Sequence, residues 1–141
     1  MTGKIMTFYL GGSLCGIDIA FAREINRNIS YTPVLGGAPY VVGLLNLRGQ
    51  IVTLFDLVRL LKLTKQDRKE SQCIILKKTF RGDSVGFLID RPGEVVDITP
   101  EMCELPPANV KKLQGKFIAE VAKSNQEIIL ILDVEKLADA L

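Results

Sequence analysis

The side chains that could do chemistry are few in this sequence. The chain contains no histidine, so a Ser–His or Cys–His nucleophile pair cannot form and a lysine base would be needed instead. Asp18, Asp56, Asp90 and Asp133 each lie in or at the end of an expected strand, where capping and turn hydrogen bonds explain them. No feature of the sequence singles out two carboxylates as an acid–base pair. The residues alone therefore single out no catalytic centre.

Phosphate and metal binding are also disfavoured. Gly11 and Gly16 have the glycine spacing of a phosphate-binding loop, but Ile17-Asp18 follow where such a loop requires Lys and then Ser or Thr. The three cysteines, at positions 15, 73 and 103, are widely separated and form no Cys-x-x-Cys pair, as expected of reduced and mostly buried side chains. Without histidine, a zinc site would need thiolates and carboxylates alone. We expect no metal and no cofactor.

Composition limits the possible partners. The chain has 141 residues, of which 48% are hydrophobic and 6% aromatic, so one domain or two small lobes would have a core of Ile, Val and Leu. A net charge of +2 is too small to indicate nucleic acid or anionic lipid as the main partner. No apolar run approaches the roughly 18 residues of a membrane span, and the alternating Ile5–Leu10 segment predicts a strand rather than a signal peptide. These features indicate a cytoplasmic protein.

Short strands separated by turn residues fill most of the chain, which is typical of small β-barrels. The segment from Tyr31 to Tyr40 contains two prolines and two glycines and is expected to be a loop outside any sheet. The charged segment from Thr64 to Ser71 is the linker candidate. The expected strands are Met6–Leu10, Leu14–Ile19, Glu24–Ile29, Gly43–Leu47, Ile51–Phe55, Gln72–Lys77, Ser84–Ile89, Val95–Ile98, Phe117–Lys123 and Glu127–Leu132.

The most informative segment is Gly43–Leu61, which predicts a hairpin followed by a short helical turn. Two apolar strands flank Arg48-Gly49-Gln50, a glycine-containing turn. A rigid turn would hold the donors of Arg48 at a fixed place. Arg48 could then meet a polar or acidic group of a partner, or form a salt bridge within the chain to Glu24 or Asp18.

A weak internal repeat suggests two lobes of similar construction. In each half, paired strands lead to an aspartate that begins an apolar helical segment, Asp56-Leu57-Val58 in one and Asp133-Val134-Glu135 in the other. We expect Asp133 to cap a last helix from Val134 to Leu141.

An ordered set of motifs resembles the CheW-like family of bacterial chemotaxis adaptors, and its most specific part is Asn46-Leu47-Arg48-Gly49. The resemblance runs from about Thr7 to Leu137. The other motifs are Phe8-Tyr9-Leu10-Gly11, Gly16-Ile17-Asp18-Ile19, Arg23-Glu24-Ile25, Thr32-Pro33-Val34, Tyr40-Val41-Val42-Gly43, Asp56-Leu57, Val85-Gly86-Phe87-Leu88-Ile89-Asp90 and Ile129-Leu130-Ile131-Leu132-Asp133.

The resemblance implies an all-β fold of two intertwined five-stranded SH3-like barrels with short helical turns and a C-terminal helix. A single domain would cover residues 1–141, with a first lobe at about 12–78 and a second lobe at about 79–141 that includes strand 4–11. It also implies a non-catalytic scaffold in signal transduction. Such a scaffold joins the regulatory domain of the histidine kinase CheA to the cytoplasmic tip of methyl-accepting chemoreceptors, in arrays on the inner face of the membrane.

The resemblance also assigns residues to two binding surfaces. For Gly43 the alternatives are close approach of a partner and a simple kink at the start of a strand; for Tyr31 to Tyr40 they are a contact surface and an inward fold. The receptor-binding set is Ala22, Ile25, Gly43, Asn46, Arg48 and Cys73. The kinase-binding set is Glu24, Tyr31, Tyr40, Val41, Leu47 and Gln50.

Three positions depart from the family pattern: Cys15, where an aromatic residue is common, Arg91-Pro92-Gly93 in the expected turn after Asp90, and Glu120, where glycine is frequent. Two alternatives remain open at this point. One is an adaptor of the same type in a non-flagellar chemosensory pathway. The other is a small β-barrel enzyme or ligand-binding domain with a pocket between its lobes, which would need a bound small molecule or a cluster of perturbed carboxylates.

Overall fold

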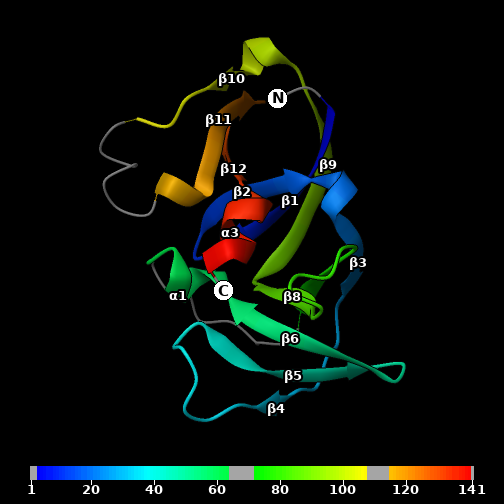
Figure 1. Ribbon diagram of the computed structural model, residues 1–141. Coiled ribbons are helices and arrows are strands. Elements are labelled where there is room, and N and C mark those ends of the chain that lie inside the picture. Colours follow the sequence, from blue (N-terminus) through cyan, green and yellow to red (C-terminus); the bar gives the residue numbers. More distant parts are fainter. Residues whose placement is uncertain (1–2, 64–71, 108–114, 141) are drawn as a thin grey trace.

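The computed structural model describes residues 3–63, 72–107 and 115–140 and contains two antiparallel-rich sheets, one above the other in Figure 1. The first-lobe sheet has the order β3 (Ala22–Asn26), β7 (Gln72–Leu76), β8 (Ser84–Ile89), β6 (Gln50–Asp56), β5 (Val41–Leu47), β4 (Thr32–Pro33). The second-lobe sheet has the order β10 (Cys103–Glu104), β11 (Ile118–Ser124), β12 (Glu127–Leu132), β2 (Ser13–Asp18), β1 (Gly3–Leu10), β9 (Arg91–Ile98).

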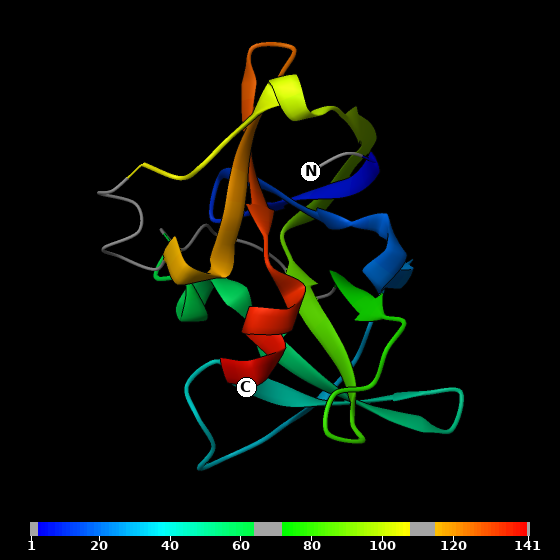
Figure 2. The same cartoon turned by 45° about the horizontal axis from the view of Figure 1, so that its top comes forward.

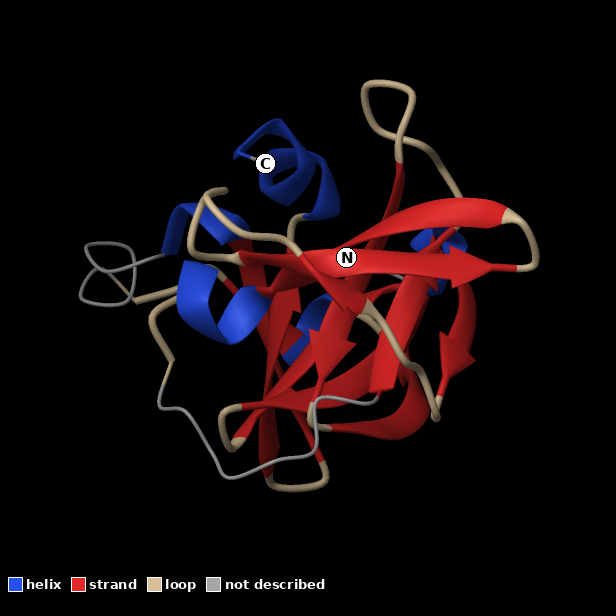
Figure 3. Ribbon diagram, turned by 90° about the horizontal axis from the view of Figure 1, so that it is seen from below, coloured by secondary structure: helices blue, strands red, loops and turns tan. Residues whose placement is uncertain are grey.

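The all-β class predicted from the sequence is confirmed, as Figure 3 shows. Each sheet has six strands where the resemblance implied five, and in each the outermost strand at one edge is only two residues long. The predicted hairpins are present, with β5 paired to β6, β7 to β8 and β11 to β12.

The chain begins in the second-lobe sheet, crosses to the first-lobe sheet at β3 and returns at β9, so the lobes are intertwined. Each sheet also contains one parallel pair, β6 with β8 and β12 with β2. The sheets divide the chain differently from the lobe boundaries inferred above. Strand β2 lies in the second-lobe sheet between β1 and β12, and β8 lies in the first-lobe sheet between β7 and β6.

Three helical segments follow strands at the junction of the lobes or near it: η1 (Ile19–Phe21), α1 (Leu57–Leu60) and α3 (Val134–Ala140). Asp56 Oδ1 accepts the backbone N–H of Val58 at 3.1 Å, and Asp133 Oδ1 accepts that of Lys136 at 3.1 Å. The two aspartates therefore cap their helices, as predicted for Asp133. In Figures 1 and 2, α3 lies between the two sheets.

Side-chain alternation divides the core into three clusters. On β7, Cys73 and Ile75 point into the interior of the first lobe, whereas Ile74 and Leu76 point into a core shared by both lobes. The shared core also contains Phe8, Leu137 and Cys15, and a third cluster around Ile5 fills the second lobe. Both sheets thus bury two faces, which explains why their central strands read as continuous apolar runs.

Three loop predictions need correction or lie outside the described residues. The segment Tyr31–Tyr40 contains β4, and Pro33 is tolerated there because β4 is an edge strand. Arg91–Gly93 is not a turn but the start of β9. The linker candidate at 64–71 lies outside the described residues. Between β9 and the end of the second described range, the chain forms η2 (Pro100–Met102) and β10.

Within residues 3–63, 72–107 and 115–140, no helix combines the length and the apolar character needed to cross a membrane.

Candidate functional site: the β5–β6 hairpin and strand β3

The turn between β5 and β6 is a two-residue connection with a fixed backbone. Leu47 pairs with Gln50, and the intervening Arg48 and Gly49 have φ of 52° and 84°. Positive φ at both central positions is the geometry of a type I′ turn, whose twist matches that of the strands. Asn46 Oδ1 also accepts the Gly49 N–H at 3.1 Å. The turn therefore presents Arg48 from a rigid base.

Side-chain contacts tie this turn to strand β3. Arg48 donates to Glu24 Oε1 at 2.5 Å, and Arg23 donates to Gln50 Oε1 at 3.0 Å. Gln50 in turn donates to Ser84 Oγ at 2.5 Å. The salt bridge from Arg48 to Glu24, one of the two alternatives for Arg48, is present. The Arg48 side chain is still 62% exposed, so part of the guanidinium can also meet a partner.

Gly43 has a structural role that the sequence did not indicate. A Cβ at this position would lie 2.5 Å from the Thr32 carbonyl oxygen and 3.0 Å from Tyr31 Cε2. The backbone of β5 therefore passes closely under Tyr31 and β4, which pairs with it at Pro33. The close approach at Gly43 is made by its own chain.

The receptor-binding set does not form one continuous surface in this structure. Ala22 and Cys73 are buried, with 6% and 0% exposure, and Cys73 belongs to the first-lobe interior. Ile25 is half-buried against the shared core, and only Asn46 and Arg48 are exposed. Arg48 and Asn46 are exposed at the turn, and Ile25 is partly exposed on β3.

The kinase-binding set falls into two groups at opposite ends of β5. Glu24 and Gln50 lie at the turn, and Leu47 beside them is 9% exposed within the first-lobe interior. At the other end, the hydroxyl of Tyr40 donates to the Ala140 carbonyl at 3.2 Å, and Val41 packs against the shared core. Tyr31 is half-buried over Gly43. Of the two alternatives for the segment from Tyr31 to Tyr40, a contact surface or an inward fold, the inward fold is observed at both tyrosines.

Two exposed apolar side chains of the β5–β6 hairpin were not predicted from the sequence as contact residues. Leu44 is 39% exposed and Ile51 is 55% exposed. Their strand neighbours Leu45 and Val52 point into the first lobe, so Leu44 and Ile51 lie on the outer face of the hairpin. Ile51 is directly opposite Asn46. The alternation of β5 and β6 was the available signal, but the sequence does not show which of two apolar faces is outermost.

Cys15 and Cys73 are unsuited to chemistry at neutral pH. Burial raises the pKa of Cys15 to about 12, and the nearby Asp90 carboxylate adds to the effect. Burial also raises the pKa of Cys73 to about 12, with a contribution from Glu24. A protonated thiol is a weak nucleophile and a poor metal ligand. The described residues contain no cluster of three His, Cys, Asp or Glu side chains that could hold a metal ion.

The sequence matches the family model described as CheW-like domain over residues 4–141. Among curated proteins it is similar to the chemotaxis protein CheW of Treponema pallidum, with 28% identity over 139 residues that cover 95% of this chain and 81% of that protein. The similarity to the Helicobacter pylori chemotaxis protein CheW is 31% over 138 residues, covering 95% of this chain and 80% of the relative.

Among solved structures, the fold is similar to that of the scaffolding protein TtCheW from Thermoanaerobacter tengcongensis. The TM-score is 0.82 at 29% sequence identity, and the match covers 95% of this chain and 86% of the other.

Proposed function

The chain belongs to the CheW-like domain family, and we propose that it is a non-catalytic chemotaxis adaptor that couples the histidine kinase CheA to methyl-accepting chemoreceptors. It would act in the cytoplasm, at receptor arrays on the inner face of the membrane. The family match over nearly the whole chain supports the adaptor role. The observation that carries the proposal within the structure is the rigid β5–β6 hairpin, which presents an exposed arginine at its tip and exposed apolar side chains on its outer face.

For the receptor we propose the surface formed by β3 and the hairpin tip. Ile25 offers a partly exposed apolar contact, and Arg48 offers charged donors whose position is fixed by the turn. Ala22, Gly43 and Cys73 would shape this surface from beneath rather than touch the receptor. A helix from a receptor tip could lay its apolar side on Ile25 and a polar or acidic group against Arg48.

For the kinase we propose the outer face of β5 and β6, where Leu44 and Ile51 are exposed. Apolar side chains on a rigid sheet face are effective contacts because little conformational entropy is lost when they bind. Gln50 and Glu24 lie next to this face at the turn. Tyr40, Val41 and Leu47 would support it from inside.

Two binding surfaces on one rigid body explain how an adaptor without catalytic groups can couple a kinase to a receptor. Binding of the kinase and the receptor to the same molecule raises the effective concentration of each for the other. Contacts of modest size suffice for this, since small interfaces are often transient.

The test is a calorimetric titration of this chain with the isolated CheA regulatory domain from the same genome. We expect saturable one-to-one binding that Ile51→Asp weakens about tenfold or more, because a charge would be buried against an apolar partner. Ile128→Asp is the matched control, since Ile128 is 57% exposed but lies on β12 of the other lobe. Failure to bind, or equal weakening by both substitutions, would contradict the proposal.

A further inference from the structure

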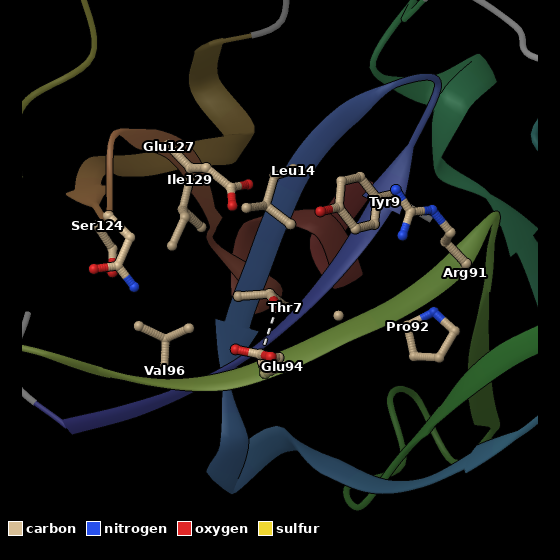
Figure 4. Close-up of a pocket in the computed structure, with 12 residues that line it drawn as sticks. Thr7, Tyr9, Leu14, Arg91, Pro92, Glu94, Val96, Ser124, Glu127 and Ile129 are labelled. Atoms are coloured by element: carbon tan, nitrogen blue, oxygen red, sulfur yellow. Dashed lines mark hydrogen bonds between the residues drawn. The ribbon is translucent and has the colours of Figure 1, made fainter.

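A solvent-accessible cavity of about 420 Å³ opens in the second lobe, away from the hairpin and β3. Its walls come from β1, β2, β9, the end of β11, β12 and the turn between β11 and β12. In Figure 4, Arg91 and Tyr9 lie at one end, Glu127 and Ser124 at the other, and Thr7 and Leu14 between them. The volume is in the range of small-ligand sites.

An irregularity in the β1–β9 ladder shapes the floor of this cavity. The register shifts between Met6 and Phe8. At this point the Glu94 carbonyl accepts a hydrogen bond from the side-chain hydroxyl of Thr7, Oγ1, at 2.5 Å. A Cβ at Gly93 would lie 3.2 Å from the Thr7 carbonyl carbon and closer still to its hydroxyl oxygen. Only glycine lets β9 bend this closely around Thr7, so the bulge is built into the sequence.

Opposite charges line the two ends of the cavity. The guanidinium carbon of Arg91 lies 3.8 Å from the centre of the Tyr9 ring, which holds the cation at its end. Glu127 supplies a carboxylate at the far end, and Glu94 lies between. Within the described part of the chain, none of these three side chains forms an ion pair with another residue. A ligand that has an anionic and a cationic end would match both.

The wall formed by β9 adds a second kind of recognition. β9 is the edge strand of the second-lobe sheet and pairs only with β1 among the described strands. An edge strand presents backbone N–H and C=O groups that an added peptide can pair with. Apolar side chains, Leu14, Val96 and Ile129, complete the lining. Separated opposite charges, an apolar floor and an edge strand in the wall are together the features of a site for an extended peptide.

We propose that this cavity binds a short peptide of about three residues with free termini, which would span roughly 10 Å when extended. The C-terminal carboxylate lies at Arg91 and the N-terminal ammonium group at Glu127. The peptide backbone runs along β9, and small side chains face Leu14 and Ile129. This site is independent of the proposed kinase and receptor surfaces, so it can be present whether or not the adaptor function holds.

The test uses trialanine with free termini as the probe and nitrogen-15 labelled full-length chain. Amide chemical shifts should change for β1, β9 and the start of β12 with a saturable dependence on peptide concentration. Removal of one charge partner by Arg91→Gln or by Glu127→Gln should weaken binding about tenfold. The exposed Lys77→Gln on the other lobe should leave the affinity unchanged.

The same peptide with an acetylated N-terminus and an amidated C-terminus is the chemical control. It should bind at least tenfold more weakly, because both charged ends are lost. The proposal is overturned if trialanine causes no saturable shifts at millimolar concentration, if the shifts lie outside this cavity, or if the capped peptide binds equally well. Glu127 is exposed at a turn, so Glu127→Gln gives a folded test protein even if loss of Arg91 disturbs Tyr9.

Discussion

Arg48 and Glu24 form an ion pair that joins the β5–β6 turn to β3, across 24 positions of sequence. The pair links a residue assigned to receptor binding with one assigned to kinase binding. The two proposed partner surfaces would therefore meet at the hairpin tip, and the proposal requires Arg48 to be available to a receptor while it holds Glu24. Its exposure of 62% permits this.

Substitution of Arg48 should affect receptor binding much more than stability. We expect Arg48→Asp to weaken binding of a receptor-tip peptide about tenfold or more, and binding of the CheA regulatory domain less than threefold. The free energy of unfolding should fall by about 1 kcal/mol or less, because the ion pair is exposed. Calorimetry and urea unfolding would measure these effects.

Lys123→Asp is the control for Arg48→Asp, because Lys123 forms an exposed pair with Glu104 in the other lobe. It should change neither binding reaction. Equal loss of receptor and kinase binding by Arg48→Asp would reject the assignment of separate surfaces.

Gly43→Ala should destabilise the first lobe. The new Cβ would collide with the Thr32 carbonyl and the Tyr31 ring, and overpacking of this kind typically costs about 1–3 kcal/mol. Gly37→Ala is the matched control, since its Cβ would meet the nearest atoms at an ordinary 3.9 Å. Urea unfolding should separate the two variants. If both are as stable as the parent chain, β4 does not pack on Gly43 in solution.

Tyr40→Phe should loosen helix α3. The lost hydrogen bond to the Ala140 carbonyl is expected to lower the free energy of unfolding by about 0.5–1.5 kcal/mol. Amide hydrogen exchange in α3 should accelerate accordingly. Tyr9→Phe, whose hydroxyl makes no hydrogen bond within the described residues, should have little effect on either measurement. Unchanged exchange in the Tyr40 variant would mean that the helix is held by apolar packing alone.

Alkaline pH should destabilise the fold through the buried thiols. The pKa of Cys15 and of Cys73 is raised by burial from 9.0 to about 12. Above pH 9 the unfolded chain loses thiol protons that the native state retains, so the free energy of unfolding falls as pH rises from 9 towards 12. Below pH 9 the stabilisation is fully present. Each thiol contributes a slope of at most about 1.4 kcal/mol per pH unit.

The double variant Cys15→Ala, Cys73→Ala should show a flatter dependence of unfolding free energy on pH over that interval. Its absolute stability is expected to be lower, because two buried side chains become smaller. The slope, and not the absolute value, is the quantity to compare. An unchanged slope would show that these thiols do not remain protonated in the native state.

Local patterns in the sequence were sufficient to predict the hairpins. The β5–β6 hairpin has a glycine-containing turn between apolar strands, and both helix caps are aspartates directly after strands. The order of strands in each sheet was not predictable, because it also depends on the parallel pairs β6–β8 and β12–β2 between strands far apart in sequence. Local sequence accounts for the antiparallel partners of β2 and β8, which are β1 and β7, but not for these parallel partners.

The candidate site was predicted only in part, for a similar reason. Arg48 and Asn46 could be placed at the hairpin turn from their spacing alone. The exposure of Leu44 and Ile51 on the outer face could not be predicted in this way. Strands β5 and β6 carry apolar side chains on both faces, and which face is buried depends on what the rest of the chain covers. The contact of Gly43 with Tyr31 depends on β4, a two-residue edge strand within a segment that reads as a loop.

The most direct test of the account is whether kinase and receptor bind this chain at the same time. A receptor-tip peptide would be titrated into the preformed complex of this chain with the CheA regulatory domain, and the mass of the product measured by light scattering. A one-to-one-to-one complex is expected, with receptor affinity unchanged by the kinase domain or increased by it. Displacement of the kinase domain by the peptide would show a single shared surface and contradict the adaptor mechanism.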